Sequence, residues 1–337
     1  MNQEHAQLIA SLGFESIDSL ARALRTDGEK LNGTVELCRK GYPYVSWKEP
    51  KKSGKGFRLI ENPSQPLKLV QTRANRLLQR VFDPFVFHGC VAQTSIRTNA
   101  EPHCQNSWFL GLDLADYYAT IRPSKVYEGL LSLGATPDIA HLLTTITTIH
   151  HHVPQGAPTS PVVAAIAMRR LAGRLADLVA EFDGVLTIFG DNISISAGRD
   201  LRRYQNTIIR IIRMEGFRIR KEKTAICLPG AGKPLPGLVI KNQKIQVRPE
   251  DKEAVELIIR QCESLKASGL RSKVCWRFKH RLRGMVNHFA WLDGKTMAPF
   301  KDRFKEVDWP DSHERQVCRL RSCYCLPLPR FQQSVDA

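Results

Sequence analysis

The chain has 337 residues, of which 42% are hydrophobic and 25% are charged, which is the composition of a globular protein with one lobed domain or two domains and excludes a disordered or membrane-embedded class. Its 50 lysine and arginine residues outnumber its 33 aspartate and glutamate residues, giving a formal charge of +17. This surplus predicts an anionic partner, and nucleic acid is the leading candidate because cations that neutralise phosphates release condensed counterions.

The N-terminal stretch and the cysteines favour the cytoplasm. MNQEHAQLIASLGF lacks the basic start and apolar core of a signal peptide, and no apolar run is long enough to cross a bilayer. Nine cysteines in such a chain indicate reduced thiols, and the cluster at Cys318, Cys323 and Cys325 lacks the paired spacing of a zinc site. We therefore predict a cytoplasmic protein with no membrane partner.

Apolar periodicity divides the chain into a helical start, a mixed centre and a helical, basic end. Short helices broken at Gly13, Gly28 and Gly33 are expected over residues 1 to about 45. The further elements expected in chain order are a basic hairpin over 48–58, a helix over 67–82, a strand over 108–112, helices over 124–133, 138–147 and 161–179, a β-hairpin over 185–197, and helices over 252–265 and 276–292.

Acidic residues follow the apolar runs of the two expected strand segments. Asp113 ends the run 108–112, where a sheet commonly exposes functional groups, although an aspartate there is more often a turn or cap residue. In the hairpin, Gly190, Asp191 and Asn192 occupy the turn, and these residue types also suit tight turns without any function. The buried strands on both sides of the turn favour the functional interpretation.

A loop of small residues, PQGAPTSP at 154–161, precedes the helix expected after it. Such a loop lets its backbone approach a planar ligand closely, and the helix N-terminus favours phosphate. The ordinary alternative is a helix entry with Thr159 or Ser160 as the cap and Pro161 in the first turn.

The three segments together resemble a known family. LGLDLADYYATI, PQGAPTSP and IFGDNISIS resemble palm motifs A, B and C of reverse transcriptases, while FRLIENPSQPLKLVQ resembles their fingers segment, MEGFRIRKEKT motif D and LRGMVNHFAWL the start of the thumb. NAEPH, residues 99–103, matches the Asn-Ala-x-x-His signature of the retron branch, and PLPGLVI resembles its Val-Thr-Gly segment with Pro236 where threonine is usual.

The resemblance implies an α+β right-hand polymerase fold, with fingers, a palm of antiparallel sheet and helices, and a helical thumb. Residues 1–47 would form an N-terminal helical segment and 48–245 the fingers and palm. Residues 246–337 would form the thumb and a tail that bind RNA and duplex.

The resemblance also implies two-metal nucleotidyl transfer at the palm. Asp113, Asp191 and Asn192 are the implied catalytic residues, and with the Leu114 carbonyl they are the implied ligands of two Mg²⁺ ions, for which Mn²⁺ is a possible substitute. Tyr118 would lie beneath the incoming sugar and reject a 2′-hydroxyl. The other implied nucleotide-binding residues are Lys55, Arg58, Gln155, Gly156 and Lys223, with Lys221 close enough to confuse the last assignment.

Motif C departs from the family pattern. Its tip is usually Tyr-x-Asp-Asp, but here residues 189–192 read Phe-Gly-Asp-Asn, and an amide oxygen binds Mg²⁺ more weakly than a carboxylate. Polymerases of non-segmented negative-strand RNA viruses carry a similar Gly-Asp-Asn, so activity is still predicted. Gln93 and Thr94 replace the usual Gly-Arg, and the histidines at 150–152 are expected to be exposed because consecutive loop positions rarely converge on one metal.

RNA binding is predicted for Asn99 and His103 through the retron signature and for a basic stretch interleaved with aromatics, whose alternative is a solvated helix face. That stretch contains Arg271, Lys273, Arg277, Lys279, Arg281 and Arg283. The implied partners are a noncoding RNA that is template and primer, its RNA–DNA product and an effector protein encoded nearby, acting in antiphage defence. The alternatives are another defence or intron-type reverse transcriptase, or a catalytically weakened scaffold that binds RNA.

Overall fold

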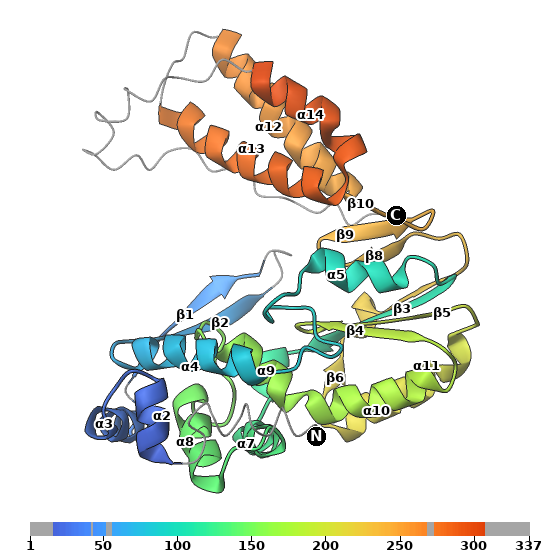
Figure 1. The fold of residues 1–337 in the computed structure, drawn as a ribbon. Helices are drawn as coiled ribbons and strands as arrows, with labels where there is room; N and C mark the ends of the chain where they lie inside the picture. Colours follow the sequence, from blue (N-terminus) through green and yellow to red (C-terminus); the bar gives the residue numbers. More distant parts are fainter. Residues whose placement is uncertain (1–15, 42, 52–55, 268–272, 307–337) are drawn as a thin grey trace. The chain divides into compact units, whose positions relative to one another are not determined.

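The computed structural model describes residues 16–41, 43–51, 56–267 and 273–306, and the chain forms two compact units, Met1–Pro229 and Gly230–Ala337. The first unit combines an antiparallel sheet with helices, and the second combines a small sheet with three helices (Figure 1). The α+β class predicted from the sequence is confirmed.

The central sheet of the first unit is built around β3 (Trp108–Ala115). It has the strand order β4–β5–β3–β6, and β7 also pairs with β3. The predicted hairpin is confirmed as β4 (Val185–Phe189) and β5 (Asn192–Ala197). The remaining two strands are β6 (Arg218–Ile219) and β7 (Ala225–Cys227). Buried residues predominate in β3 and β5, as expected for strands covered on both faces.

Helices α10 (Arg169–Ala180) and α11 (Arg202–Met214) lie on one side of this sheet, and α5 (Ile96–Ala100) lies on the other (Figure 1). α10 packs against β4, and α11 packs against β6. Helical spacing explains the packing, because Ile208 and Ile212 of α11 are four residues apart and both are fully buried.

The single helix predicted over 161–179 is wrong. Two helices are present, α9 (Ser160–Ala167) and α10, and they meet at Met168, whose ψ of −4° interrupts the helix. α9 is buried from Val162 to Ala167, whereas α10 buries one stripe. No glycine or proline marks the break, so the bend follows from the change of packing environment along the chain.

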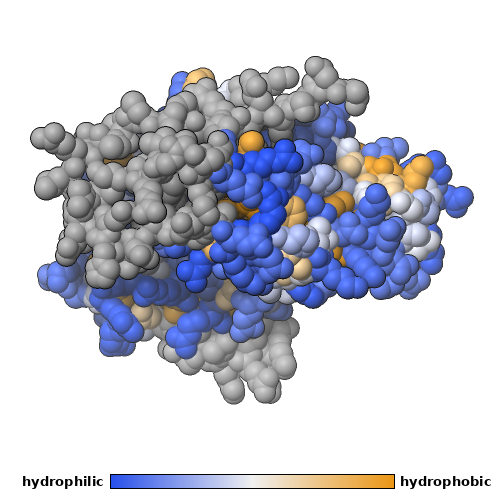
Figure 2. Space-filling view, turned by 90° about the horizontal axis from the view of Figure 1, so that it is seen from above, coloured by the Kyte–Doolittle hydropathy of each residue, from blue (hydrophilic) through white to orange (hydrophobic). Residues whose placement is uncertain are grey.

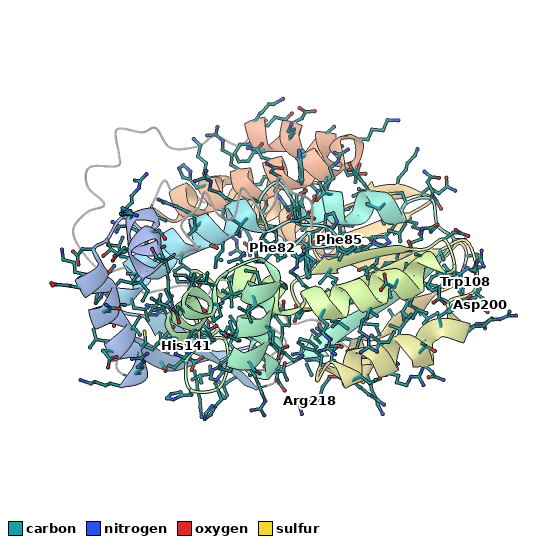
Figure 3. The ribbon with its side chains drawn as sticks, turned by 60° about the horizontal axis from the view of Figure 1, so that its bottom comes forward. Phe82, Phe85, Trp108, His141, Asp200 and Arg218 are labelled. Carbon is teal, nitrogen blue, oxygen red and sulfur yellow. The ribbon has the colours of Figure 1, made fainter. Side chains whose placement is uncertain are left out.

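At the end of β3 opposite Asp113, the Trp108 ring lies beneath the Arg202 guanidinium, 5.0 Å from the ring centroid. Asp200 holds that guanidinium through an ion pair of 2.6 Å between Arg202 Nη2 and Asp200 Oδ2, and Trp108 and Asp200 are neighbours at this edge (Figure 3). The cation–π contact with Trp108 and the ion pair with Asp200 therefore hold Arg202 over the first residue of β3.

The region predicted to form the fingers contains a two-stranded sheet and several helices. β1 (Tyr44–Pro50) pairs antiparallel with β2 (Phe57–Pro63), which confirms the predicted hairpin; its tip, residues 52–55, lies outside the described residues. The helices of this region are α2 (Ile17–Ala23), α3 (Gly28–Arg39), α4 (Leu67–Val81), α7 (Pro123–Ser132) and α8 (Pro137–Thr147).

The predicted helix break at Gly33 is wrong, because Gly33 lies inside α3. Leu31, Thr34 and Val35 bury one face of this helix, and their burial outweighs the roughly 1 kcal/mol that a mid-helix glycine costs. Gly28, by contrast, does mark a boundary. It is the first helical residue, and the Asp27 side chain caps the helix by accepting from the Lys30 amide at 2.7 Å.

The second unit contains β8 (Lys233–Leu235), β9 (Leu238–Lys241) and β10 (Lys244–Gln246), paired in the order β10–β9–β8. The helices are α12 (Pro249–Ala267), α13 (Lys273–Leu292) and α14 (Gly294–Glu306), each in contact with the other two. The first two match the predicted basic helices, and α14 was not predicted. Arg303 of α14 pairs with Glu256 of α12 at 2.6 Å and with Glu263 at 2.9 Å.

The surface agrees with the strongly charged composition. Hydrophilic side chains cover most of the coloured face in Figure 2, and apolar side chains gather there in small separate groups. None of the helices in the described part of the chain combines the length and the apolar character that a bilayer crossing requires.

We expect Gly129→Ala to destabilise the first unit, because α7 and α9 cross at this residue. An added Cβ would lie 2.8 Å from both Ile166 Cγ2 and Ile166 O, so the unfolding free energy should fall by about 1–3 kcal/mol. Gly173→Ala on α10 is the matched control, because nothing lies within 4 Å of its added Cβ. It should leave stability unchanged or raise it by up to about 1 kcal/mol in chemical denaturation. Equal effects would contradict the tight crossing.

Candidate active site at the motif C hairpin

The candidate site forms where β3 meets the turn of the β4–β5 hairpin. The antiparallel register sets Asp113 opposite Asn192, and the Leu114 amide donates to the Asp191 carbonyl at 2.8 Å. Gly190 takes the positive φ of 61° that lets the turn close in two residues. Three of the predicted metal-site residues therefore converge through backbone pairing, and the fourth, Leu114, is tied to the turn itself.

Two cationic side chains form ion pairs with the Asp113 carboxylate, and the Asp113 side chain is 7% exposed. Arg220 Nη1 lies 2.8 Å from Asp113 Oδ1, and Lys223 Nζ lies 3.1 Å from Asp113 Oδ2. Burial and the neighbouring charge of Asp113 raise the pKa of Asp191, although Arg220 and Lys223 act in the opposite direction. The site thus concentrates negative charge that requires cations nearby.

Asn192 turns its amide donors toward that charge. Its Nδ2 lies 3.0 Å from Asp191 Oδ1 and 3.4 Å from the Phe189 carbonyl. The side chain that replaces the usual carboxylate therefore stabilises the remaining one in this structure.

The donor set fits a hard divalent cation. Asp113, Asp191 and Asn192 offer oxygen atoms, which Mg²⁺ prefers, and the repulsion that raises the Asp191 pKa is the repulsion that a bound cation relieves. Among the described residues, no three His, Cys, Asp or Glu side chains cluster in a way that suits a metal.

The motif D segment supplies the cations. β6 pairs with β3 beyond Asp113, and the Arg220 amide donates to the Asp113 carbonyl at 2.8 Å, which brings η2 (Lys221–Lys223) beside the site. Lys223, and not Lys221, carries the ammonium found at the carboxylate. Sequence reasoning missed Arg220, although it lies inside the segment that resembles motif D.

Tyr118 lies near enough to Asp191 for that carboxylate to affect its pKa. It belongs to α6 (Tyr117–Thr120), and its ring centroid lies 5.0 Å from that of Tyr117. Burial raises the pKa of Tyr118 to about 12, with smaller contributions from Cys90 and Asp191. The phenol is therefore neutral and partly buried beside Asp191, a position compatible with its predicted contact with the incoming sugar.

A segment that the sequence did not single out supports the turn of motif C. The Ile188 amide donates to the Val86 carbonyl at 2.8 Å, and the His88 amide donates to the Ile188 carbonyl at 2.7 Å. Gly89 permits this approach, because a Cβ there would lie 2.6 Å from the Gly190 nitrogen. The turn is therefore held by backbone on both sides.

The motif B loop is attached to the fingers strand β2. The Glu61 amide donates to the Gln155 carbonyl at 2.8 Å, and an added Cβ on Gly156, which has φ 133°, would lie 3.1 Å from the Glu61 carbonyl. His152 Nε2 lies 2.8 Å from the buried Glu61 carboxylate. His150 and His151 are exposed as predicted, but the prediction is wrong for His152, because the loop folds back on β2.

The predicted fingers cations are only partly described. Arg58 lies on β2 opposite Glu49, whereas Lys55 lies outside the described residues. Their contact with a triphosphate stays a prediction.

The predicted thumb cations lie in the second unit on α13. Arg283 is exposed, and Lys279 and Arg281 are half-buried, while Leu282 and Val286 face the helical core. Arg271 lies outside the described residues, as do the side chains of Lys273 and Arg277.

The structure corrects the RNA contact predicted for Asn99 and His103. Both side chains are fully buried. His103 Nδ1 lies 2.7 Å from Ser196 Oγ, and His103 Nε2 lies 2.8 Å from Thr187 Oγ1. Because those hydroxyls belong to β5 and β4, the histidine joins the two strands of the motif C hairpin from within the protein and has no surface to offer RNA.

The chain is similar to proteins of one family. Residues 50–270 match the model of the family described as reverse transcriptase (RNA-dependent DNA polymerase). The chain is 31% identical over 241 residues to the retron Mx65 reverse transcriptase of Myxococcus xanthus, covering 65% of this chain and 56% of that protein. It is 28% identical over 255 residues to the retron Ec86 reverse transcriptase of Escherichia coli, covering 74% and 76% respectively. A solved structure of apo telomerase from Candida tropicalis matches at 10% identity and TM-score 0.49, covering 87% of this chain and 66% of that one.

Because the family match covers more than half of the chain, this protein belongs to the reverse transcriptase family. Its curated relatives, which include the Mx65 and Ec86 enzymes, assign it to the retron type.

We expect His103→Ala to lower the unfolding free energy by about 2–4 kcal/mol, because it leaves a cavity and removes the hydrogen bonds of the imidazole to two buried hydroxyls. His141→Ala on the exposed face of α8 is the control and should change stability by less than about 0.5 kcal/mol (Figure 3). Thermal and chemical denaturation measure both variants. RNA affinity per folded molecule should match the wild type, and a specific loss of RNA affinity at unchanged stability would restore the predicted contact.

Proposed function

We propose that this chain is an RNA-directed DNA polymerase that copies part of a noncoding RNA into single-stranded DNA. The observation that carries the proposal is the register of β3 against β5, which brings Asp113 to the Asp191–Asn192 turn. The family match and the retron relatives support the same activity. The catalytic set is Asp113, Asp191 and Asn192.

Reverse transcriptases generally use divalent metal ions, and we propose two Mg²⁺ here, with Mn²⁺ as a substitute. Asp113, Asp191, Asn192 and the Leu114 carbonyl would hold them. Bound at this site, such ions would lower the pKa of the primer hydroxyl and neutralise charge on the phosphates.

Residues of the chain would bind the incoming nucleotide and donate a proton to the leaving group. Lys223, whose ammonium already lies at the Asp113 carboxylate, would donate a proton to the departing pyrophosphate. Tyr118 would exclude a 2′-hydroxyl by its bulk, and the backbone at Gln155 and Gly156 would contact the incoming nucleotide. Lys55 and Arg58 would bind its triphosphate.

The proposed partners are a noncoding RNA that acts as template and primer, the RNA–DNA product, and an effector protein encoded nearby in antiphage defence. We assign residues 48–245 to fingers and palm, and the helices after 246 to a thumb whose α13 cations follow the phosphate backbone. Residues 1–47 would form the N-terminal segment. The alternative, an RNA-binding scaffold with weakened catalysis, rests on Asn192.

The direct test is DNA synthesis by Asp113→Ala and Asp191→Ala on a primed RNA template. Each should lower the rate about 100-fold or more, because each removes a metal-binding carboxylate. Asp116→Ala is the matched control, since Asp116 lies just beyond β3 and pairs with Arg218 at 2.9 Å on the exposed surface. The control should keep most of the activity. Synthesis retained in either Asp113→Ala or Asp191→Ala would overturn the assignment, and RNA binding should survive in all three.

We expect Asn192→Asp to lower the Mg²⁺ concentration needed for half-maximal synthesis, because a carboxylate is a stronger ligand than an amide for a hard cation. The wild type should also polymerise, but only at higher Mg²⁺. A Mg²⁺ titration of both proteins on the same template measures the shift. Synthesis by the variant alone would favour the scaffold alternative, and identical curves would show that residue 192 does not contact the metal.

A further inference from the structure

Both oxygens of the Asp113 carboxylate are already bound by cationic side chains of the same chain. Arg220 Nη1 lies 2.8 Å from Oδ1, and Lys223 Nζ lies 3.1 Å from Oδ2. We propose that Arg220 is a positioning residue that holds Asp113 in the metal-free protein and competes with a divalent cation for that carboxylate. The inference rests on the metal site of the proposed function.

The backbone places Arg220 where this competition is unavoidable. The Arg220 amide donates to the Asp113 carbonyl at 2.8 Å, directly after the β3–β6 pairing of Leu114 with Ile219. The two residues are therefore neighbours through main-chain bonds, and the guanidinium needs no long reach to find the carboxylate. It remains beside the metal site even when another partner takes Oδ1.

Of the two cations, Arg220 is the one committed to this carboxylate. Its side chain is 25% exposed, whereas that of Lys223 is 55% exposed. A guanidinium keeps its charge at every physiological pH and holds its donors in a rigid plane, while a lysine ammonium on a flexible stem is easily redirected. Lys223 can therefore leave for a phosphate, and Arg220 stays as the fixed counterion of Asp113.

The charges of the acidic and basic side chains at the site explain why Asp113 has Arg220 as a fixed counterion. Asp113 and Asp191 contribute two negative charges, and Arg220 with Lys223 contributes two positive ones, so these four side chains are neutral without metal. Asn192 adds no third carboxylate. A buried carboxylate without a partner is strongly destabilising. Arg220 therefore stabilises Asp113 when no metal is bound, and it raises the metal concentration required for binding.

The test measures Mn²⁺ binding to the full chain without nucleotide or RNA, by the loss of the free-ion signal in electron paramagnetic resonance. Arg220→Gln should lower the apparent Kd for Mn²⁺ about tenfold, because it removes the guanidinium that competes with the ion for the partly buried Asp113 carboxylate. Circular dichroism melts confirm that each variant is folded. DNA synthesis is assayed separately, so a tightened Mn²⁺ affinity without synthesis would overturn the proposed function and leave this inference standing.

Arg218→Gln is the matched control. Arg218 lies two residues earlier in the chain, on β6, and pairs with Asp116 at 2.9 Å, but its side chain is 69% exposed and extends outward (Figure 3). The substitution removes the same charge where solvent screens it, so the Kd should change less than about twofold. If the two variants changed the apparent Kd for Mn²⁺ equally, the effect would come from the net charge of the protein alone, and the inference would be overturned.

A double-mutant cycle identifies the carboxylate concerned. In an Asp113→Asn background, Arg220→Gln should no longer tighten Mn²⁺ binding, because the shared ligand is gone. A persistent tightening would overturn the pairing, as would weaker binding in Arg220→Gln alone or no Mn²⁺ binding by any variant. If Arg220→Gln fails to fold, Arg220→Lys replaces it, and its shorter, redirected charge should tighten binding in the same direction by a smaller factor.

Discussion

The antiparallel register between β3 and the β4–β5 hairpin is the constraint on which the rest of the site depends. It sets Asp113 opposite Asn192 and ties Leu114 to the Asp191 carbonyl. Because side chains alternate along a strand, a shift of one residue would move every side chain of β3 to the opposite face of the sheet, and Asp113 would no longer lie beside the Asp191–Asn192 turn. Burial of the two strands therefore fixes the positions of the candidate site residues. A change in core packing that shifted the register would also displace Asp113 from the Asp191–Asn192 turn.

Such a register concentrates negative charge, and the surrounding elements compensate for it. The motif D segment adds Arg220 and Lys223 at the carboxylate, and Asn192 donates to Asp191 in place of a third acid. The site without metal is thus balanced by the chain itself. This balance gives motif C a chemical context in which an asparagine is tolerated, because a third carboxylate would demand still more positive charge.

The β4–β5 hairpin contacts two further segments of the first unit, one across both of its strands and one at its turn. His103 bridges Thr187 and Ser196, one on each strand, while Gly89 lets a neighbouring segment approach the turn at Gly190. The segment that resembles the retron signature therefore acts on the palm through internal hydrogen bonds. Arg283 on α13 in the second unit is exposed, unlike Asn99 and His103, so RNA binding by that cation stays a prediction.

The sequence alone determined the family, the strands that end in acids and the residues of the candidate site, because buried strands and their turn residues leave a local signature. Tertiary structure decided which lysine of motif D reaches Asp113, that Arg220 joins it, and that His103 lies inside the palm. It also decided that Met168 divides one apparent helix into two. These outcomes depend on strand pairing and burial between segments up to 110 residues apart in sequence, and local periodicity carries no information about such contacts.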